Sequence, residues 1–291
     1  MAAHKFTDIY KQTAACSIQA DIYQNELKGM PVIVLVHGGA LIWGSRADYS
    51  QRQIGRYLEA GFSVVSIDYR LAPESKIASI VEDIQDALIW VGTDGADQYG
   101  YDGNRLAVVG CSAGGYLSLM SGTFSRKPKA IVSFYGYGDL LGDWYCKPSP
   151  HYCRQPLASR EEAYGCVGEA MRSEGATDRY RFYLYCRQQG IWTTEVSGYD
   201  IDAERNQVIQ YCPAYCAGVD YPPTLLLHGD LDTDVPYQQS VIMAEKLTNV
   251  GVVHRLITLV GKGHGFDDEM KSPDVQNAFT DVIQFLGKYL A

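Results

Sequence analysis

The chain has 291 residues, of which 46% are hydrophobic and 20% are charged, with a formal net charge of −9. This composition excludes an intrinsically disordered chain, and the length suits one large core with an insertion. The acidic balance disfavours nucleic acid or an anionic membrane as a partner and favours neutral or cationic small molecules.

Targeting signals and cysteines give further expectations. The first residues, MAAHKFTDIYKQ, lack the layout of a secretory signal, and no apolar stretch approaches the roughly 20 residues of a membrane span. We therefore expect a cytoplasmic protein without a membrane span. The eight cysteines include no C-x-x-C pair, so we expect free thiols and no structural zinc.

Residues 6–24 alternate loosely between apolar and polar side chains, which predicts an antiparallel hairpin at a sheet edge. Five short apolar runs follow, and each is typical of a strand buried on both faces, as in a parallel sheet. They are VIVLV (32–36), SVVSI (63–67), LAVVG (106–110), AIVSF (130–134) and TLLLH (224–228). A sixth run, HRLITLV (254–260), also suits a strand.

Helical patterns lie between these runs. Apolar residues recur at intervals of three and four over 77–91, and Ser272 with Pro273 marks the start of a last amphipathic helix. The alternation predicts an α/β fold with a mostly parallel central sheet, helices on both faces and a helical lid insertion.

The insertion spans residues 138–221, where no buried-strand run occurs. It holds ten of the 22 tyrosines and six of the eight cysteines, with helix-like pieces such as residues 160–175. We expect a core formed by 1–137 and 222–291, and a tyrosine-rich lid or cap formed by 138–221. The alternative is a helical excursion that merely covers one face of the sheet.

The most informative segment is Gly110-Cys111-Ser112-Ala113-Gly114, a G-x-S-x-G pentapeptide between a predicted strand and a predicted helix. Small flanking residues let strand and helix approach closely, and the turn holds the serine hydroxyl at the top of the sheet. An incidental serine in a tight turn is the alternative. A serine nucleophile requires a base, an orienting acid and oxyanion donors.

Candidates for all three roles are present. His264, in the glycine-rich loop GKGHGF, is the expected base, whereas His228 is expected to shape the acid loop. The loop GDLDTDVP offers Asp230, Asp232 and Asp234, of which Asp232 is favoured as the acid and Asp230 is in reserve. A calcium-loop reading of these aspartates fails, because valines occupy the positions that need glycine and glutamate.

The segment HGGA directly follows the strand at 32–36. Its glycines let backbone N–H groups approach a developing oxyanion, so we expect the oxyanion donors to be Gly38, Gly39 and Ala113. A simple turn after a strand is the alternative.

Together these segments resemble the α/β-hydrolase superfamily, esterase/lipase type, through HGGA (37–40), DYRLAPE (68–74), GCSAGG (110–115), HGDLDTDVP (228–236) and GHGF (263–266). By position the resemblance assigns the nucleophile to Ser112, the acid to Asp232 and the base to His264. HGGA replaces the commoner HGGG of the hormone-sensitive-lipase-like group, and Cys111 stands where many members carry an acid. The insertion between serine and acid is more like feruloyl and acetyl-xylan esterases.

These observations predict a carboxylesterase that uses a Ser-His-Asp triad, needs no metal or cofactor and cleaves small-molecule esters with short or aromatic acyl groups. Feruloyl or acetyl-sugar esters are candidates. The alternatives are a serine peptidase or amidase of the same fold and a noncatalytic ligand receptor. The sequence leaves the natural ester and the oligomeric state open.

Overall fold

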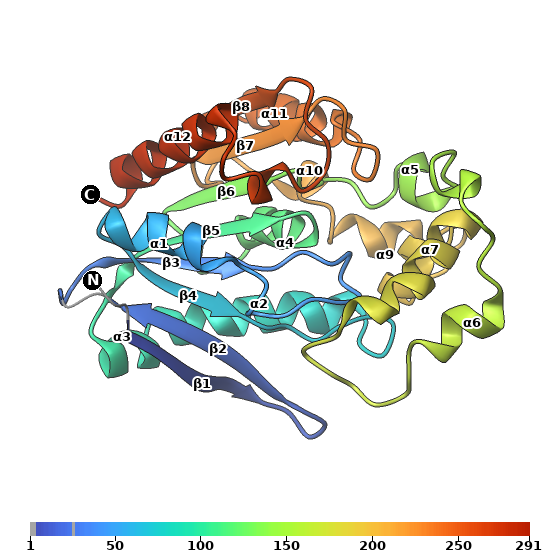
Figure 1. Ribbon diagram of the computed structural model, residues 1–291, viewed down its shortest axis with the longest axis horizontal. Coiled ribbons are helices and arrows are strands. Elements are labelled where there is room, and N and C mark those ends of the chain that lie inside the picture. Colours follow the sequence, from blue (N-terminus) through green and yellow to red (C-terminus); the bar gives the residue numbers. More distant parts are fainter. Residues whose placement is uncertain (1–3, 25–26) are drawn as a thin grey trace.

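A computed structural model describes residues 4–24 and 27–291. Its described strands form one eight-stranded sheet in the order β1-β2-β4-β3-β5-β6-β7-β8 (Figure 1). Their bounds are β1 His4–Gln12, β2 Ser17–Gln24, β3 Pro31–Val36, β4 Ser63–Ile67, β5 Asp102–Cys111, β6 Ala130–Phe134, β7 Thr224–Gly229 and β8 His254–Leu259. The predicted α/β class with a mostly parallel sheet is confirmed.

Strand direction follows the sequence pattern. The alternating first segment forms the antiparallel β1–β2 hairpin at one edge of the sheet, as predicted, and β2 also pairs antiparallel with β4. The remaining pairs, β4–β3, β3–β5, β5–β6, β6–β7 and β7–β8, are all parallel. Every residue of β3, β4, β6 and β7 is buried, because these strands are covered on both faces.

Helices cover both faces of this sheet. On one face α1 (Gln51–Glu59) and α12 (Pro273–Tyr289) pack against side chains such as Ile33 and Leu35. On the other, α2 (Ile77–Val91) and α4 (Ala113–Ser121) pack against the alternate residues Val34 and Val36, and α11 (Gln238–Asn249) packs beside α4. The short α3 (Asp94–Tyr99) follows α2. Each fully buried aliphatic side chain contributes roughly 1.5–3 kcal/mol.

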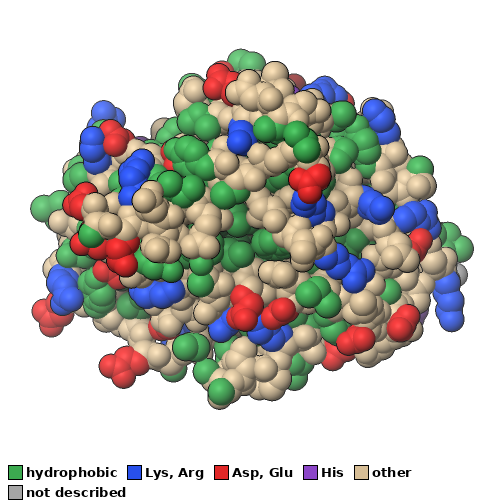
Figure 2. All heavy atoms as spheres, turned by 180° about the vertical axis from the view of Figure 1, so that it is seen from behind, with side chains coloured by type: hydrophobic (Ala, Val, Ile, Leu, Met, Phe, Trp, Pro, Cys, Tyr) green, Lys and Arg blue, Asp and Glu red, His purple; other side chains and the backbone are tan. Residues whose placement is uncertain are grey.

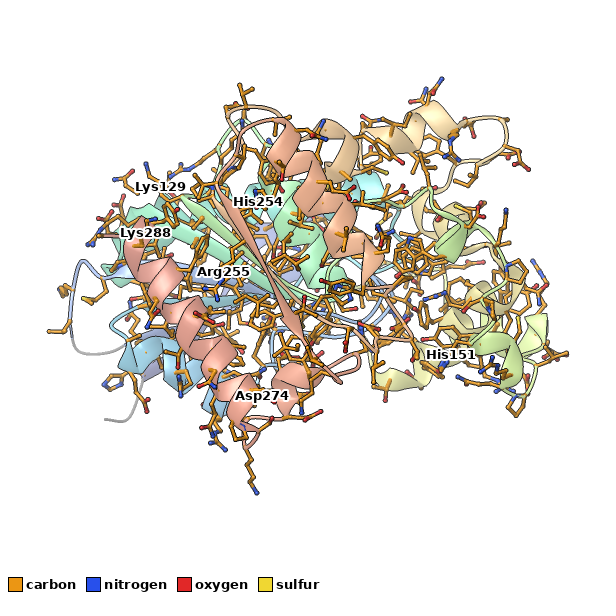
Figure 3. All side chains as sticks on the ribbon, turned by 90° about the horizontal axis from the view of Figure 1, so that it is seen from above. Lys129, His151, His254, Arg255, Asp274 and Lys288 are labelled. Atoms are coloured by element: carbon orange, nitrogen blue, oxygen red, sulfur yellow. The ribbon has the colours of Figure 1, made fainter. Side chains whose placement is uncertain are left out.

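The two helices predicted most clearly are present with the expected bounds. In α12, Pro273 occupies the first turn as expected, although the Ser272 side chain makes no capping hydrogen bond. Asp274 lies in the first turn and Lys288 in the last, at opposite ends of the helix (Figure 3). This order of charges suits the helix dipole.

The segment 138–221 is built from short helices gathered beyond the carboxyl ends of the parallel strands (Figure 1). They are α5 Asp143–Cys146, η1 Tyr152–Arg154, α6 Arg160–Gly165, η2 Thr177–Arg179, α7 Tyr180–Gln189, α8 Trp192–Ser197, α9 Arg205–Ile209 and α10 Pro213–Cys216. The helix-like reading of 160–175 was too long, because the helix ends at Gly165 and a second glycine follows at 168. That 138–221 acts as a lid, separate from a core of 1–137 and 222–291, stays a prediction.

The exterior carries acidic and basic side chains interspersed over the face that Figure 2 shows. None of the helices in the described ranges has the length and apolarity that a bilayer span requires. All eight cysteines are free thiols.

Candidate active site

Ser112 lies at the turn between β5 and α4, with φ 54° and ψ −119°. This conformation is strained for a residue with a side chain, so the surrounding contacts must hold it. The Ser112 N–H donates to the carbonyl oxygen of Phe134 at 2.9 Å, which ties the turn to the end of β6. The hydroxyl is therefore fixed at the carboxyl edge of the sheet.

The glycines of the pentapeptide are required by close packing at this turn. A Cβ at Gly110 would overlap the carbonyl of Gly114, and a Cβ at Gly114 would overlap the carbonyl oxygen of Val36. The first turn of α4 thus lies directly against the end of β3. This close approach is what the spacing of small residues predicted.

The three residues proposed as a triad come together. His264 Nε2 lies 3.0 Å from Ser112 Oγ, and His264 Nδ1 lies 2.7 Å from Asp232 Oδ2. Ser112 follows β5, Asp232 follows β7, and His264 follows β8. Because the carboxyl ends of parallel strands meet at one edge, residues 152 positions apart form a single hydrogen-bonded chain.

Asp232 is held on both carboxylate oxygens. Its Oδ1 accepts the backbone N–H groups of Asp234 at 2.8 Å and Val235 at 2.9 Å, while Oδ2 faces His264 and lies 3.3 Å from His228 Nε2. Burial disfavours the charged form, but hydrogen bonds from His228 and His264 outweigh it and lower the pKa of Asp232. Asp232 is therefore an ionised partner that fixes the imidazole.

Asp230, the reserve acid, is placed differently. Its Oδ1 accepts the N–H of Gly261 at 2.6 Å, and its side chain joins the two loops that follow β7 and β8. His228 behaves as expected, because Nδ1 lies 2.7 Å from Ser240 Oγ and Nε2 lies 3.0 Å from the carbonyl oxygen of Val235. Both residues therefore shape the acid loop.

The charge state of His264 follows from its surroundings. Burial favours the neutral ring, but the hydrogen bond to Asp232 and the charges of Asp234, Asp232 and Asp267 outweigh it and raise the pKa of His264. The ring of Tyr135 lies against the imidazole, with centroids 4.5 Å apart. Tyr135 thus limits how far the ring of His264 can turn.

The HGGA segment bends sharply after β3. Gly39, Ala40 and Leu41 have positive φ values of 96°, 53° and 63°, so two residues with side chains adopt the left-handed region. A Cβ on Gly38 would lie 3.4 Å from Ser112 Cβ, which places the Gly38 backbone beside the serine. Ala113 is the first residue of α4, directly after Ser112. Gly38 and Gly39 line the same cavity as Ser112, and that the N–H groups of Gly38, Gly39 and Ala113 act as oxyanion donors stays a prediction.

Two side chains of the insertion donate hydrogen bonds to the backbone of this segment and of the residues just after it. Trp192 Nε1 donates to the carbonyl oxygen of Ala40 at 3.2 Å, and Arg179 Nε donates to that of Ile42 at 2.6 Å. Both side chains are almost fully buried. From the core side, the Tyr69 hydroxyl donates to the carbonyl of His37 at 2.9 Å. Hydrogen bonds from both sides therefore stabilise the strained segment.

A cavity of about 250 Å³ opens beside Ser112. Its walls contain predicted site residues together with several that the sequence did not reveal. The unforeseen lining residues are Trp43, Asp48, Tyr49, Gln53, Tyr135, Asp267 and Asp268, whereas Cys111 and Asp234 belong to segments that the sequence had singled out. Tyr135 directly follows β6, so the rule that strand ends form the site could have found it.

Asp267 is the least expected member of this wall. Its Oδ2 accepts from Gln53 Nε2 at 2.8 Å, and its Oδ1 accepts from the Tyr135 hydroxyl. Burial raises the pKa of Asp267 to about 6. Its position three residues after His264, in GHGFDDE, is the sequence signal that could have indicated it.

The other histidines lie away from this cavity or serve structure. His254 begins β8 and His151 lies in the insertion, well apart from each other (Figure 3). His37 is fully buried, and burial lowers its pKa to about 4. Within the described ranges, no three His, Cys, Asp or Glu side chains are arranged to hold a metal ion.

Three features define an α/β-hydrolase fold. They are the sheet order, the strained serine after β5 and the histidine in the loop after β8. Comparisons with known proteins agree. The family model described as BD-FAE matches residues 20–156, and the model of the prolyl oligopeptidase family matches residues 157–291.

Individual relatives are similar in sequence and structure. The chain is 28% identical to Esterase LipC from Mycobacterium tuberculosis over 255 residues, which cover 82% of this chain and 54% of LipC. It thus spans about half the length of that relative, and 14% of the non-reducing polyketide synthase ausA from Penicillium brasilianum, to which it is 27% identical. An α/β-hydrolase superfamily protein from Enterococcus faecalis has a similar structure, with a TM-score of 0.73, 22% identity and coverage of 99% of this chain and 100% of that one.

A hyperthermophilic esterase from the archaeon Pyrobaculum calidifontis is 25% identical, with a TM-score of 0.71 and coverage of 100% of this chain and 84% of that one. The chain thus has the α/β-hydrolase fold and is similar in sequence to esterases. This confirms the resemblance found in its sequence.

Proposed function

We propose that this chain is a serine hydrolase that cleaves carboxylic esters. The observation that supports this most is the hydrogen-bonded chain from Asp232 through His264 to Ser112, which opens onto a cavity. The names of its relatives, which include esterases from two organisms, agree with this chemistry. The substrate is a small molecule, and a cytoplasmic location stays a prediction.

The proposed reaction has two halves. Ser112 Oγ attacks the ester carbonyl carbon and gives its proton to His264 Nε2, while N–H groups of Gly38, Gly39 and Ala113 stabilise the oxyanion. The tetrahedral intermediate then collapses, and His264 protonates the departing alcohol. A water molecule repeats the sequence on the acyl-enzyme, releases the acid and restores the serine hydroxyl.

The experiment that tests this reaction is hydrolysis of p-nitrophenyl acetate by Ser112→Ala and His264→Ala. Each variant should lose about 10⁴-fold or more in kcat, as loss of a triad member does elsewhere. His254→Ala, at the far end of β8, is the matched control and should keep the rate of the parent protein. Full activity of Ser112→Ala would refute the proposal, and failure of a fluorophosphonate probe to label the parent protein would favour a noncatalytic receptor.

The cavity gives the substrate class. A volume of about 250 Å³ is small compared with typical ligand pockets of roughly 300–1,000 Å³, which favours short acyl groups. Trp43, Tyr49 and Tyr135 offer aromatic surface, so feruloyl or acetyl-sugar esters are further candidates. Equal rates on feruloyl, acetyl-sugar and long-chain fatty esters would contradict this preference.

The lining is also acidic. Asp48, Asp267 and Asp268 contribute carboxyl groups, whereas the charge of Asp234 is offset by Arg187, and the lining residues themselves include neither lysine nor arginine. A concave site with this charge attracts cations and repels anions. We therefore expect esters with neutral or cationic groups to be preferred to esters that carry a second carboxylate.

Amide hydrolysis is a second candidate, favoured by the match of residues 157–291 to the prolyl oligopeptidase family. Amide and ester cleavage can share one nucleophile and one oxyanion site. Measuring kcat/KM on aminoacyl-naphthylamides and on acyl esters of equal size distinguishes amide hydrolysis from ester hydrolysis. A higher kcat/KM on the amides would replace the esterase proposal with a peptidase.

A further inference from the structure

Asp234 is a second carboxylate beside the candidate base. Its Oδ2 lies 3.6 Å from His264 Nε2, the same nitrogen that faces Ser112 Oγ at 3.0 Å. The distance of 3.6 Å is too long for a hydrogen bond, although Asp234 lines the catalytic cavity. A shift of less than about 1 Å would bring this oxygen into the charge-assisted range.

The insertion occupies the other oxygen of this carboxylate. Asp234 Oδ1 accepts from the Tyr152 hydroxyl at 2.8 Å, from Arg187 Nη1 at 2.8 Å and from the Tyr183 hydroxyl. Arg187 Nη2 also donates to the backbone carbonyl of Asp234 at 3.2 Å. Three side chains from 138–221 therefore pull Asp234 to the side away from His264.

Arg187 is itself held firmly. Its side chain is 3% exposed, and its guanidinium carbon lies 4.7–5.5 Å from the centroids of four aromatic rings. These belong to Trp144, Tyr145, Tyr152 and Tyr183. Cation–π attraction in a desolvated cage of this kind fixes the cation, so Asp234 cannot move without giving up its partner.

We propose that Arg187 is a positioning residue: it restrains Asp234 so that His264 Nε2 stays directed at Ser112. The proposal rests on the proposed hydrolase function for its kinetic consequence, but its structural consequence can be measured without turnover. If Arg187 were lost, Asp234 Oδ2 would be free to accept a hydrogen bond from Nε2–H. This hydrogen bond would stabilise the charged imidazolium form of His264 relative to the neutral imidazole that acts as the base.

The charges around His264 define the direction of the effect. Asp232 and Asp234 face the ring from the loop after β7, Asp267 from the loop after His264, and the neutral Tyr135 from the end of β6. Arg187 offsets one of these carboxylates. Its removal should raise the pKa of His264, and removal of the Asp234 charge should lower it.

The test is an NMR titration of His264 in the folded protein, together with the pH profile of kcat/KM on p-nitrophenyl acetate. Arg187→Met keeps the length of the side chain and removes its charge and donors, and should move both midpoints up by about 1 pH unit. Asp234→Asn should move them down. The double variant Arg187→Met/Asp234→Asn should have the same midpoints as Asp234→Asn, because position 234 then carries no carboxylate for Arg187 to restrain.

Arg181→Met is the matched control, because Arg181 lies on the same helix α7 and pairs with the exposed Glu162. It should leave both midpoints unchanged. If Arg187→Met does not fold, Tyr152→Phe removes one donor to Asp234 with little loss of volume and should shift the midpoints in the same direction.

A purely structural role for Arg187 predicts a different result. Activity or stability would fall equally at every pH, with the His264 midpoint unmoved in Arg187→Met and Tyr152→Phe, and this outcome would overturn the proposal. The NMR titration can be repeated in Ser112→Ala, where turnover is removed. Failure of the hydrolase proposal and failure of this positioning role are therefore distinguishable.

Discussion

The buried ion pair between Glu74 and Arg179 connects the insertion to the core, and its loss should be costly. Arg179 donates to both carboxylate oxygens, with Nη1 to Oε1 at 2.9 Å and Nη2 to Oε2 at 2.6 Å. The side chains are 1% and 0% exposed. The same guanidinium holds the carbonyl oxygens of Ile42 and Ala72, so the pair also positions the HGGA segment.

The perturbation is Glu74→Gln, which keeps the shape of the side chain and leaves the Arg179 charge buried without its counter-charge. Breaking a buried pair from one side costs about 3–5 kcal/mol. At roughly 2–4 °C per kcal/mol for a large domain, Tm should fall by about 6–20 °C. Glu162→Gln breaks the exposed pair with Arg181 on the same insertion and should change Tm far less than Glu74→Gln, because solvent screens that pair.

Thermal and urea unfolding of the parent protein and the variants measure these differences. The double variant Glu74→Gln/Arg179→Met should be more stable than Glu74→Gln alone, because no buried charge remains unpaired. Two results would refute the reasoning. One is an equal loss of unfolding free energy in Glu74→Gln and Glu162→Gln. The other is a double variant that loses the sum of the unfolding free energies lost by Glu74→Gln and Arg179→Met.

The same pair predicts a dependence of stability on pH. Burial disfavours the Glu74 carboxylate, but hydrogen bonds from Arg179 and the Gly168 amide outweigh it and lower its pKa. A depressed pKa contributes stability above the unfolded value of about 4.3, and this contribution is lost as pH falls through the folded value. Glu74→Gln should lack this part of the acid sensitivity.

Four further predictions concern the site. Because the pKa of His264 is raised and catalysis needs the neutral ring, kcat/KM should fall with decreasing pH through a midpoint above 6.5, and a flat profile into strong acid would contradict a histidine base. Gly114→Ala should fail to fold or lose several kcal/mol in urea unfolding, because its Cβ would overlap the Val36 carbonyl, and a parent-like midpoint would contradict this packing. Burial raises the pKa of the Cys111 thiol to about 12, so iodoacetamide at pH 8 should leave activity intact, and rapid inactivation that Cys111→Ala abolishes would show a reactive thiolate. Among nitrophenyl esters of matched length, kcat/KM should be higher for 4-aminobutyrate and butyrate than for hemisuccinate, and a preference for hemisuccinate would contradict an acidic cavity.

Much of the fold could be predicted from the sequence because local pattern and tertiary environment agree in the core. The run VIVLV is buried on both faces, as an uninterrupted apolar strand must be, and the 77–91 periodicity matches a helix with those bounds. The proximity of Ser112, Asp232 and His264 was predictable because each follows a strand of the same parallel sheet.

The helices and contacts of the insertion could not be predicted in the same way. Its helices are mostly four to six residues long, too short to show a period, and its organising contacts join residues distant in sequence. Arg187 reaches Asp234 over 47 positions, and Trp192 reaches Ala40 over 152. Nothing in local composition distinguishes these side chains from the other arginines and aromatic residues nearby. The positive φ of Ala40 and Leu41 was equally hidden, since neither is a glycine.

The bracing of the HGGA segment by Trp192 and Arg179 has an evolutionary consequence. Both side chains come from residues 138–221, yet they support the backbone that is expected to stabilise the transition state, so selection on this segment also acts on the rate. Libraries that diversify 138–221 to obtain new substrates should therefore keep Trp192 and Arg179 fixed, because changes at these two positions would alter turnover for every substrate at once.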